Sequence, residues 1–205
     1  ICPMDLTGRD NCFKLYDKYK DEDIDILVNN AGFGLLGNSW ETDINREMKM
    51  IDLNVTAVHI LTKLFLQDMV KKDKGRILNV ASIAGFLVGP TLNTYYATKS
   101  YVTKWTLGLY EELRRAKSNV HVSCLCPGPV DTNFNKVAGT SFMINGLSSE
   151  YVAKYGVDKM LKNKLIIIPG FFVKLGAFLS RFISYKFLLK IMYMLQKQKV
   201  RGKNV

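Results

Sequence analysis

Short apolar runs alternate along this chain with longer segments in which apolar residues recur at helical spacing. The apolar runs, each bounded by turn residues, predict strands at residues 24–28, 76–80, 119–125 and 164–168. The periodic segments predict helices at residues 10–20, 45–72 and 93–115. Residues 131–149 are less regular, with Gly139 and Gly146 as breakers. Strands that alternate with long helices predict an α/β fold built around a parallel sheet.

Small and polar residues follow three of the predicted strands. They form clusters at residues 29–32, 81–85 and 127–132. In open parallel sheets, ligands bind in the crevice beyond the carboxyl ends of the strands. The three clusters are therefore expected to form one composite site.

The charge of the chain is concentrated in its last part. The 205 residues are 48% hydrophobic, which is enough for a substantial core, and the net charge is +11. Residues 1–158 contain 18 basic and 18 acidic residues, whereas residues 159–205 contain 11 basic residues and no acidic ones. The pattern indicates a neutral domain at residues 1–170 followed by a basic tail at residues 171–205. No nucleic-acid partner is expected, because the tail lacks interleaved arginines and stacking aromatics.

The tail contains a predicted basic amphipathic helix at residues 185–197. Lys186, Lys190 and Lys197 share one side of it, and the remaining residues are largely apolar. Such a helix can lie on an anionic membrane surface, and it can also pack on its own domain or on a partner subunit. Packing on protein is the favoured alternative.

The four cysteines are too few and too scattered for a disulfide framework, so a reducing, cytoplasmic location is expected. Peripheral attachment of the protein to a membrane is the alternative. Cys124 and Cys126 lie in the apolar run 121–126, and the chain has only two histidines. Because structural zinc needs four ligands at other spacings, we expect buried strand thiols and no metal site.

Tyr95 and Lys99 lie four residues apart near the start of a predicted helix and therefore share one face. A free tyrosine has a pKa near 10. An ammonium group about 4 Å away could lower that pKa by about three units and make the hydroxyl a proton donor and acceptor at neutral pH. This spacing is common in proteins, so it indicates a catalytic site only if the other residues of such a site are also present.

Those partners are present in a characteristic order. They are Asn29-Asn30-Ala31-Gly32 after a strand, Asn54 in the next helix, Ser82 after the following strand, Tyr95 with Lys99, and Pro127-Gly128 with Thr132. Over about residues 5 to 170, the chain resembles the short-chain dehydrogenase/reductase family. The resemblance implies a doubly wound, Rossmann-like sheet and a nicotinamide-dependent oxidoreductase.

The resemblance also implies catalytic roles for four residues. Tyr95 would be the general acid and base, and Ser82 would orient the substrate oxygen. Lys99 would hold the nicotinamide ribose and lower the pKa of the tyrosine, and Asn54 would fix a water molecule at a helix kink. These groups can form hydrogen bonds without bringing negative charge into the site.

A larger set of residues is implied to bind the cofactor, by contacts along its adenosine, ribose and nicotinamide parts. The set is Asp5, Leu6, Asn29, Ala31, Gly32, Asn54, Tyr95, Lys99, Pro127, Gly128, Val130 and Thr132. The expected cofactor is NADP or NAD, with NADP slightly favoured. A homo-oligomer, either a dimer or a tetramer, is also expected.

The family's glycine-rich phosphate loop is absent from these 205 residues, and the chain begins with Ile1. We therefore expect a fragment whose first strands and helices are missing. The alternatives are a catalytically inactive binding or scaffold protein with the same fold, and a relative of the sugar-nucleotide epimerases.

The substrate is expected to be a small carbonyl compound or alcohol of apolar character. Residues 134–155 are expected to cover its pocket, and Phe134, Phe142, Met143 and Leu147 make this segment apolar.

Overall fold

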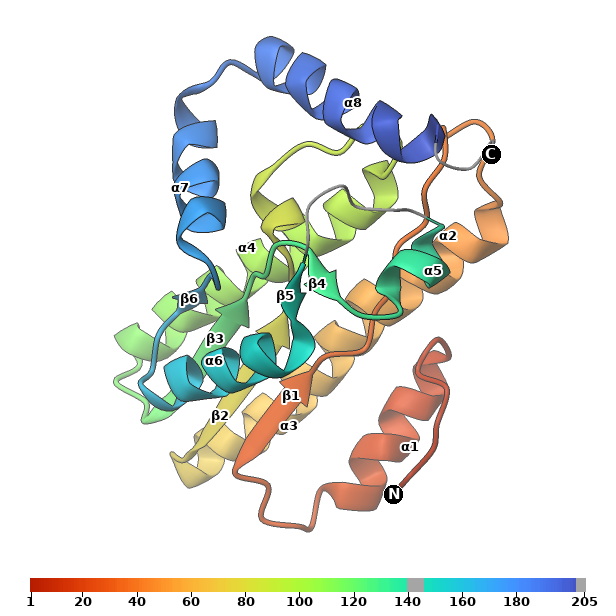
Figure 1. The fold of residues 1–205 in the computed structure, drawn as a ribbon. Coiled ribbons are helices and arrows are strands. Elements are labelled where there is room, and N and C mark those ends of the chain that lie inside the picture. The colour runs from red at the N-terminus through yellow and green to blue at the C-terminus, as the bar shows by residue number, and fades with distance from the viewer. Residues whose placement is uncertain (140–145, 202–205) are drawn as a thin grey trace.

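A four-stranded parallel sheet in the order β1-β2-β3-β6 forms the centre of the protein (Figure 1). The computed structural model describes residues 1–139 and 146–201. The strands of this sheet are β1 (Ile26–Asn29), β2 (Gly75–Val80), β3 (Val120–Leu125) and β6 (Ile166–Ile167). A separate parallel pair joins β4 (Val130–Asp131) to β5 (Leu147–Ser148). The predicted α/β fold with a parallel sheet is confirmed.

Eight α-helices accompany the strands in the described part of the chain. They are α1 (Arg9–Tyr19), α2 (Ile44–Ile51), α3 (Val58–Lys72), α4 (Asn93–Arg115), α5 (Phe134–Ala138), α6 (Ser149–Leu161), α7 (Phe171–Leu179) and α8 (Tyr185–Arg201). Short 3₁₀ helices are η2 (Ile83–Phe86) and η3 (Ser180–Phe182). The helix predicted at residues 45–72 is α2 and α3, joined by the π-helix η1 (Asp52–Ala57).

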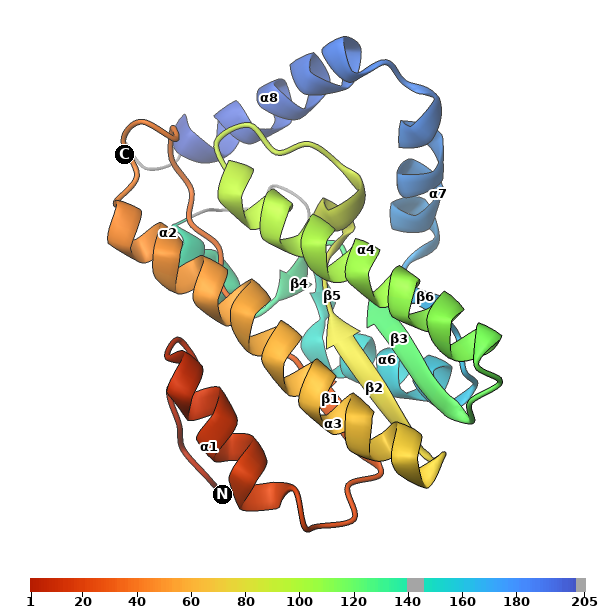
Figure 2. The same ribbon diagram turned by 180° about the vertical axis from the view of Figure 1, so that it is seen from behind.

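Helices cover both faces of the sheet, as Figure 1 and Figure 2 show from opposite sides. Successive side chains of β2 pack on opposite faces of the sheet. Ile77 packs in the cluster that includes Met69 of α3 and Leu113 of α4, whereas Leu78 packs in the cluster that includes Met160 of α6. Successive side chains of a strand point to opposite faces, so one apolar strand contributes to two cores.

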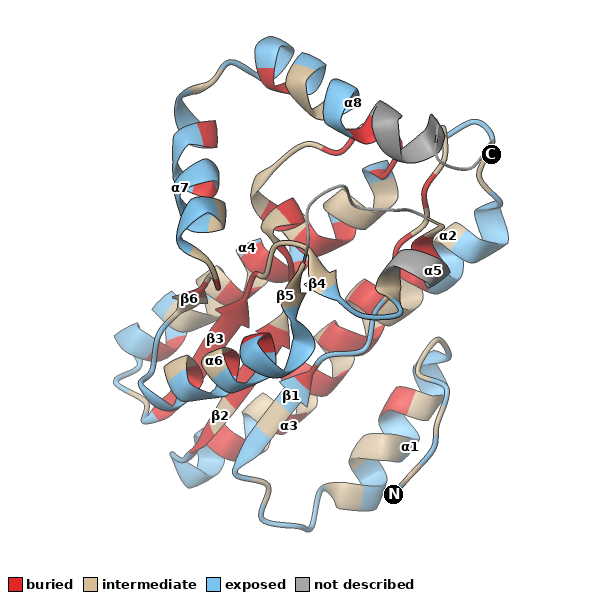
Figure 3. Cartoon of the chain, viewed as in Figure 1, coloured by how far each residue is buried: buried red, intermediate tan, exposed pale blue. Residues whose placement is uncertain are grey.

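Strand β1 is more exposed than its apolar sequence predicted. Ile26 is 41% exposed and Val28 is 47% exposed, whereas Leu27 packs beneath the helices of the other face. The strand pairs with β2 alone and forms the edge of the sheet, so one of its faces lies in the open (Figure 3). The apolar strand predicted at residues 24–28 is therefore packed on one face only.

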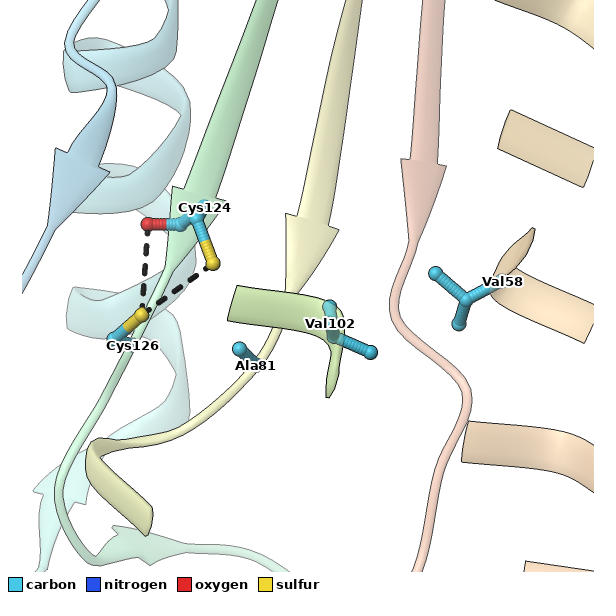
Figure 4. Close-up of a cluster of buried hydrophobic side chains, with 5 residues drawn as sticks. All are labelled: Val58, Ala81, Val102, Cys124 and Cys126. Carbon is cyan, nitrogen blue, oxygen red and sulfur yellow. Dashed lines mark hydrogen bonds between the residues drawn. The ribbon is translucent and has the colours of Figure 1, made fainter. Parts of the chain in front are cut away.

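Cys124 and Cys126 are buried free thiols, as predicted. Their Sγ atoms lie 3.5 Å apart, because residues two apart on a strand share one face. They pack with Val58, Ala81 and Val102 between the sheet and the helices (Figure 4).

Three helices, the short α5 and the longer α6 and α7, were not predicted from the sequence. In α6, the buried residues Val152, Gly156 and Met160 recur four apart, which is a helical signal inside an otherwise mixed stretch. In α7, nearly every residue is apolar, so no periodicity marks it as a helix.

Candidate active site

A cavity of about 850 Å³ opens beyond the carboxyl ends of the strands. Its walls include residues from the loops after β1, β2 and β3, from the start of α4, and from α6 and α8. The three clusters that the sequence places after strands thus meet at one edge of the sheet, as parallel strands require.

Tyr95, Ser82 and Lys99 all line this cavity. The first turns of α4 place Tyr95 and Lys99 on one face, with the Lys99 ammonium 5.9 Å from the centre of the Tyr95 ring. Lys99 is only 5% exposed, and its Nζ donates a hydrogen bond of 2.9 Å to the carbonyl oxygen of Val80. Ser82 begins η2, and its Oγ accepts a hydrogen bond of 3.1 Å from the backbone N–H of Ala84.

Burial dominates the electrostatics of the pair. Burial raises the pKa of Tyr95 to about 12, and the hydrogen bond with Ser82 offsets only part of that rise. Burial likewise lowers the pKa of Lys99 to about 8. The expectation that Lys99 brings the tyrosine pKa close to 7 is therefore wrong for this structure. The cost of placing a phenolate in an apolar site exceeds the stabilisation by an ammonium that is held at the carbonyl of Val80.

Asn54 connects the catalytic helix to the loop after β1. It is fully buried in the π-helix η1, where its Oδ1 accepts from Phe33 N over 3.0 Å and its Nδ2 donates to Phe33 O over 2.9 Å. Its Nδ2 also donates a hydrogen bond of 3.1 Å to Oγ1 of Thr98, which lies between Tyr95 and Lys99 in the sequence of α4. The π-turn inserts an extra residue into the helical turn, a feature that often marks functional sites. The helix irregularity expected at Asn54 is present, although its side chain lies behind the cavity wall.

Gly32 occupies a position with no room for a larger residue. A Cβ atom there would lie 2.9 Å from Asn54 Oδ1 and 3.3 Å from Lys99 Nζ. The absent side chain thus lets the loop after β1 approach both polar groups closely.

Asn29 is directed into the protein and not into the cavity. Its Nδ2 donates to Thr62 Oγ1 and to Asn79 Oδ1, both over 2.9 Å, and Asn79 in turn donates to Thr106 Oγ1. This buried network ties β1 and β2 to α3 and α4. Its position gives Asn29 a structural task at the carboxyl end of β1.

The structure places three further cofactor candidates outside the cavity walls. Ala31 lies in the loop beside Gly32 but does not line the cavity. The Asp5 carboxylate accepts a hydrogen bond of 3.0 Å from Thr7 N, which lowers its pKa, and Leu6 packs in the apolar cluster around Cys12. Both precede α1, away from the cavity.

The remaining cofactor candidates follow β3 and line the cavity. They are Pro127, Gly128, Val130 and Thr132. A Cβ atom at Gly128 would lie 2.9 Å from Val173 Cγ2 of α7, so the loop and the tail are in close contact. Thr132 Oγ1 accepts a hydrogen bond of 3.2 Å from Phe134 N at the start of α5.

Helix α8 supplies cavity residues that the sequence did not nominate. Met192, Leu195 and Gln196 line the cavity, and Gln196 is fully buried. Gln196 Nε2 donates to the Tyr96 hydroxyl over 3.0 Å. Packing on its own domain, the favoured alternative for the tail, is what the structure shows for this face of α8. A glutamine at an apolar helix position is the signal that could have found this contact.

Phe134 forms part of the apolar wall that was expected for the substrate. Its ring centre lies 5.2 Å from that of Tyr95. Leu147 packs instead against the cluster around Leu125, whereas Phe142 and Met143 lie outside the described residues. The apolar wall is completed by Leu92, Val137 and Val152.

Comparison with known proteins agrees with this arrangement. Residues 1–141 match the short chain dehydrogenase family. This chain belongs to the short-chain dehydrogenase family. It is 32% identical to mouse estradiol 17-beta-dehydrogenase 11 over 188 residues, which are 90% of this chain and 63% of that protein. It is 29% identical to rat 17-beta-hydroxysteroid dehydrogenase 13 over 191 residues, 92% of this chain and 63% of that protein.

Solved structures of other short-chain dehydrogenases share the fold. One from Sphingobium yanoikuyae in complex with NADPH matches with a TM-score of 0.75 at 25% identity, covering 82% of this chain and 66% of that one. One from Burkholderia phymatum in complex with NAD matches with a TM-score of 0.75 at 23% identity, covering 85% of this chain and 72% of that one. The chain thus spans 63% of the length of the two curated relatives, and the two solved structures contain NADPH and NAD, respectively.

Proposed function

We propose that this chain carries the catalytic and substrate-binding residues of an NAD(P)-dependent oxidoreductase that interconverts an apolar ketone and its alcohol. The observation that carries the proposal is the meeting of Tyr95, Ser82 and Lys99 at one largely apolar cavity. A proton donor, a second hydroxyl and a buried cation are the groups that a carbonyl reduction needs around the substrate oxygen.

In the reducing direction, the Tyr95 hydroxyl donates its proton to the substrate oxygen while the Ser82 hydroxyl holds that oxygen by a hydrogen bond. The pKa of about 12 keeps Tyr95 protonated at neutral pH, as a proton donor must be. In the oxidising direction, the Tyr95 phenolate accepts the proton of the alcohol and becomes the neutral phenol. The Lys99 ammonium, 5.9 Å from the tyrosine ring, stabilises the phenolate that is left after proton donation and that must be present before proton acceptance.

The residues beside the catalytic groups fit a nicotinamide cofactor. The space next to Gly32, which a Cβ atom would fill, lies beside the Lys99 ammonium, so Lys99 can bind ribose hydroxyls. Pro127, Gly128 and Thr132 would hold the nicotinamide end from the other side of the cavity. When bound, the cofactor supplies or accepts the hydride. NADP is proposed as the first choice and NAD as the second.

The substrate proposal rests on the size and lining of the cavity. Its volume of about 850 Å³ lies within the range of small-molecule sites, and its walls include Phe134, Leu92 and Met192. Relatives are named for estradiol and for hydroxysteroids. We therefore propose a steroid-sized ketone or alcohol as the substrate class.

The test is nicotinamide turnover with estrone as the ketone and with estradiol as the alcohol. Wild-type protein should oxidise NADPH or NADH with the ketone, and Tyr95→Phe should reduce kcat/KM by at least about a hundredfold, since it removes the transferred proton. Tyr101→Phe is the matched control, because Tyr101 lies on the same helix and its hydroxyl contacts His59 Nδ1 at 2.8 Å, away from the cavity.

Near-wild-type turnover by Tyr95→Phe would show that the assigned mechanism is wrong. Binding of the steroid without any nicotinamide turnover would favour the alternative of an inactive binding protein. The homo-oligomer and the cytoplasmic location stay predictions, to be checked by light scattering and by cell fractionation.

A further inference from the structure

The outer side of the C-terminal helices carries a group of exposed aromatic residues. Each of them is between 54% and 84% exposed, and together they are called the aromatic surface: Phe171, Phe172, Phe178, Phe182, Tyr185 and Phe187. They come from α7, η3 and the start of α8, which lie next to one another along one end of the molecule (Figure 1, Figure 3). The rings of Phe171 and Phe172 are in contact, as are those of Phe178 and Phe182. Exposed apolar residues that gather in this way mark an interaction site.

Packing on the domain does not account for this surface. Helix α7 uses only a narrow stripe for packing, in which Val173 contacts Gly128 and Ala177 is 5% exposed. A surface helix that packs only on the core of its own domain has polar residues on its remaining sides. In α7 every exposed residue except Lys174 and Gly176 is a large apolar one, which favours a further apolar partner.

Basic side chains lie among the aromatic residues. Lys174, Arg181, Lys186 and Lys190 are all exposed, and no acidic residue occurs in residues 159–205. A second copy of the same surface would oppose these cations with like charges. An anionic lipid surface offers negative headgroups for the cations and an apolar interior for the rings.

We propose that the aromatic surface docks on an anionic membrane surface. Aromatic rings are favoured at the boundary between headgroups and acyl chains, and lysine and arginine side chains extend from apolar surroundings to the headgroups. Among residues 1–139 and 146–201, no helix is long and apolar enough to cross a membrane.

The docking surface is adjacent to the cavity. Met192 and Leu195 of α8 line the cavity, while Phe187 and Tyr185 of the same helix belong to the aromatic surface. Docking would place the cavity next to the lipid phase in which an apolar ketone dissolves. This last step rests on the proposed function, whereas the docking itself does not.

The experiment is flotation of the protein with phosphatidylcholine vesicles prepared with and without phosphatidylserine. Wild type should float with the anionic vesicles, and high salt should weaken its binding because it screens the headgroup charge. The variant Phe172→Ser/Phe182→Ser should lose about tenfold in affinity for each phenylalanine. Its control is Phe13→Ser/Tyr151→Ser, two exposed aromatic residues, 46% and 48%, outside the aromatic surface, on α1 and α6.

A charge variant provides a second, independent measurement. Replacing Lys174, Arg181, Lys186 and Lys190 by glutamine should weaken binding by about fivefold for each charge removed. The control replaces four exposed lysines of the charge-balanced part of the chain, Lys14, Lys63, Lys71 and Lys104. Circular dichroism confirms that each variant is folded.

Absence of flotation, or equal binding to neutral and anionic vesicles, would overturn the proposal. A change from dimer to monomer in Phe172→Ser/Phe182→Ser, without any vesicle binding by wild type, would assign the surface to contacts between copies. Because flotation needs no turnover, a failure of the proposed function leaves its result unchanged. The access route is tested separately: the aromatic variant should slow reduction of a ketone supplied in anionic vesicles but not of one dispersed in detergent.

Discussion

Gln196 of α8 and Tyr96 of α4 are joined by a hydrogen bond of 3.0 Å from Gln196 Nε2 to the tyrosine hydroxyl. Gln196 Oε1 also accepts a hydrogen bond of 3.2 Å from Thr91 Oγ1. The glutamine is fully buried, so these bonds form away from water. The contact fixes α8 over the cavity, directly beside Tyr95.

Gln196→Ala should therefore loosen α8. The change leaves the hydroxyls of Thr91 and Tyr96 without their partner, which costs about 1–3 kcal/mol in the free energy of unfolding. Denaturant unfolding measures this loss, and limited proteolysis should cut α8 faster. Gln67→Ala is the control, because Gln67 is exposed on α3 and should change stability by less than about 0.5 kcal/mol. Equal stability of the two variants would contradict the anchoring role.

Asn54→Ala should destabilise the protein by about 1–3 kcal/mol, because it removes the buried bonds to the backbone of Phe33 and to Thr98. It should also reduce turnover, since the loop that carries Gly32 loses its link to the catalytic helix. Thermal unfolding and nicotinamide turnover measure the two effects. Asn45→Ala, an exposed position in α2, should leave both nearly unchanged.

Lys99 should make stability depend on pH in the alkaline range. Burial lowers its pKa from 10.5 to about 8, so between these values the unfolded chain binds one proton more than the folded protein. Stability then rises with pH from about 8 to 10.5, by up to about 1.4 kcal/mol per pH unit.

The measurement is the difference in unfolding free energy between wild type and Lys99→Met at a series of pH values. This difference should shift in favour of wild type as pH rises through the window. Lys104→Met, at an exposed position of the same helix, should show no such trend relative to wild type. A flat difference for Lys99→Met would show that the lysine is not perturbed by burial.

Two glycine-to-alanine changes should have opposite signs. Gly32→Ala places a Cβ atom 2.9 Å from Asn54 Oδ1, so it should cost about 1–3 kcal/mol and lower cofactor affinity. Gly108→Ala, within α4, meets no atom within 4 Å and should stabilise the protein by about 0.5–1 kcal/mol. Denaturant midpoints and titration with NADPH measure these effects. Stabilisation by both changes would contradict the close approach at Gly32.

The sequence predicted the elements that depend on local pattern. The helix predicted at residues 93–115 coincides with α4, because its periodicity and its breakers act within a few residues. The π-helical turn at Asn54 and the partial exposure of β1 could not be predicted from the local pattern. The first depends on contacts with Phe33 and Thr98, and the second depends on which strands are neighbours in the sheet.

The sequence by itself determined the strands of the main sheet, the long helices between them and the clusters that follow the strands, because hydrophobic periodicity and turn residues act locally. Only the tertiary structure decided the protonation behaviour of Tyr95, the inward direction of Asn29 and the position of α8 over the cavity. Each of these depends on burial and on contacts between residues far apart in the chain. Spacing along a sequence does not specify such contacts.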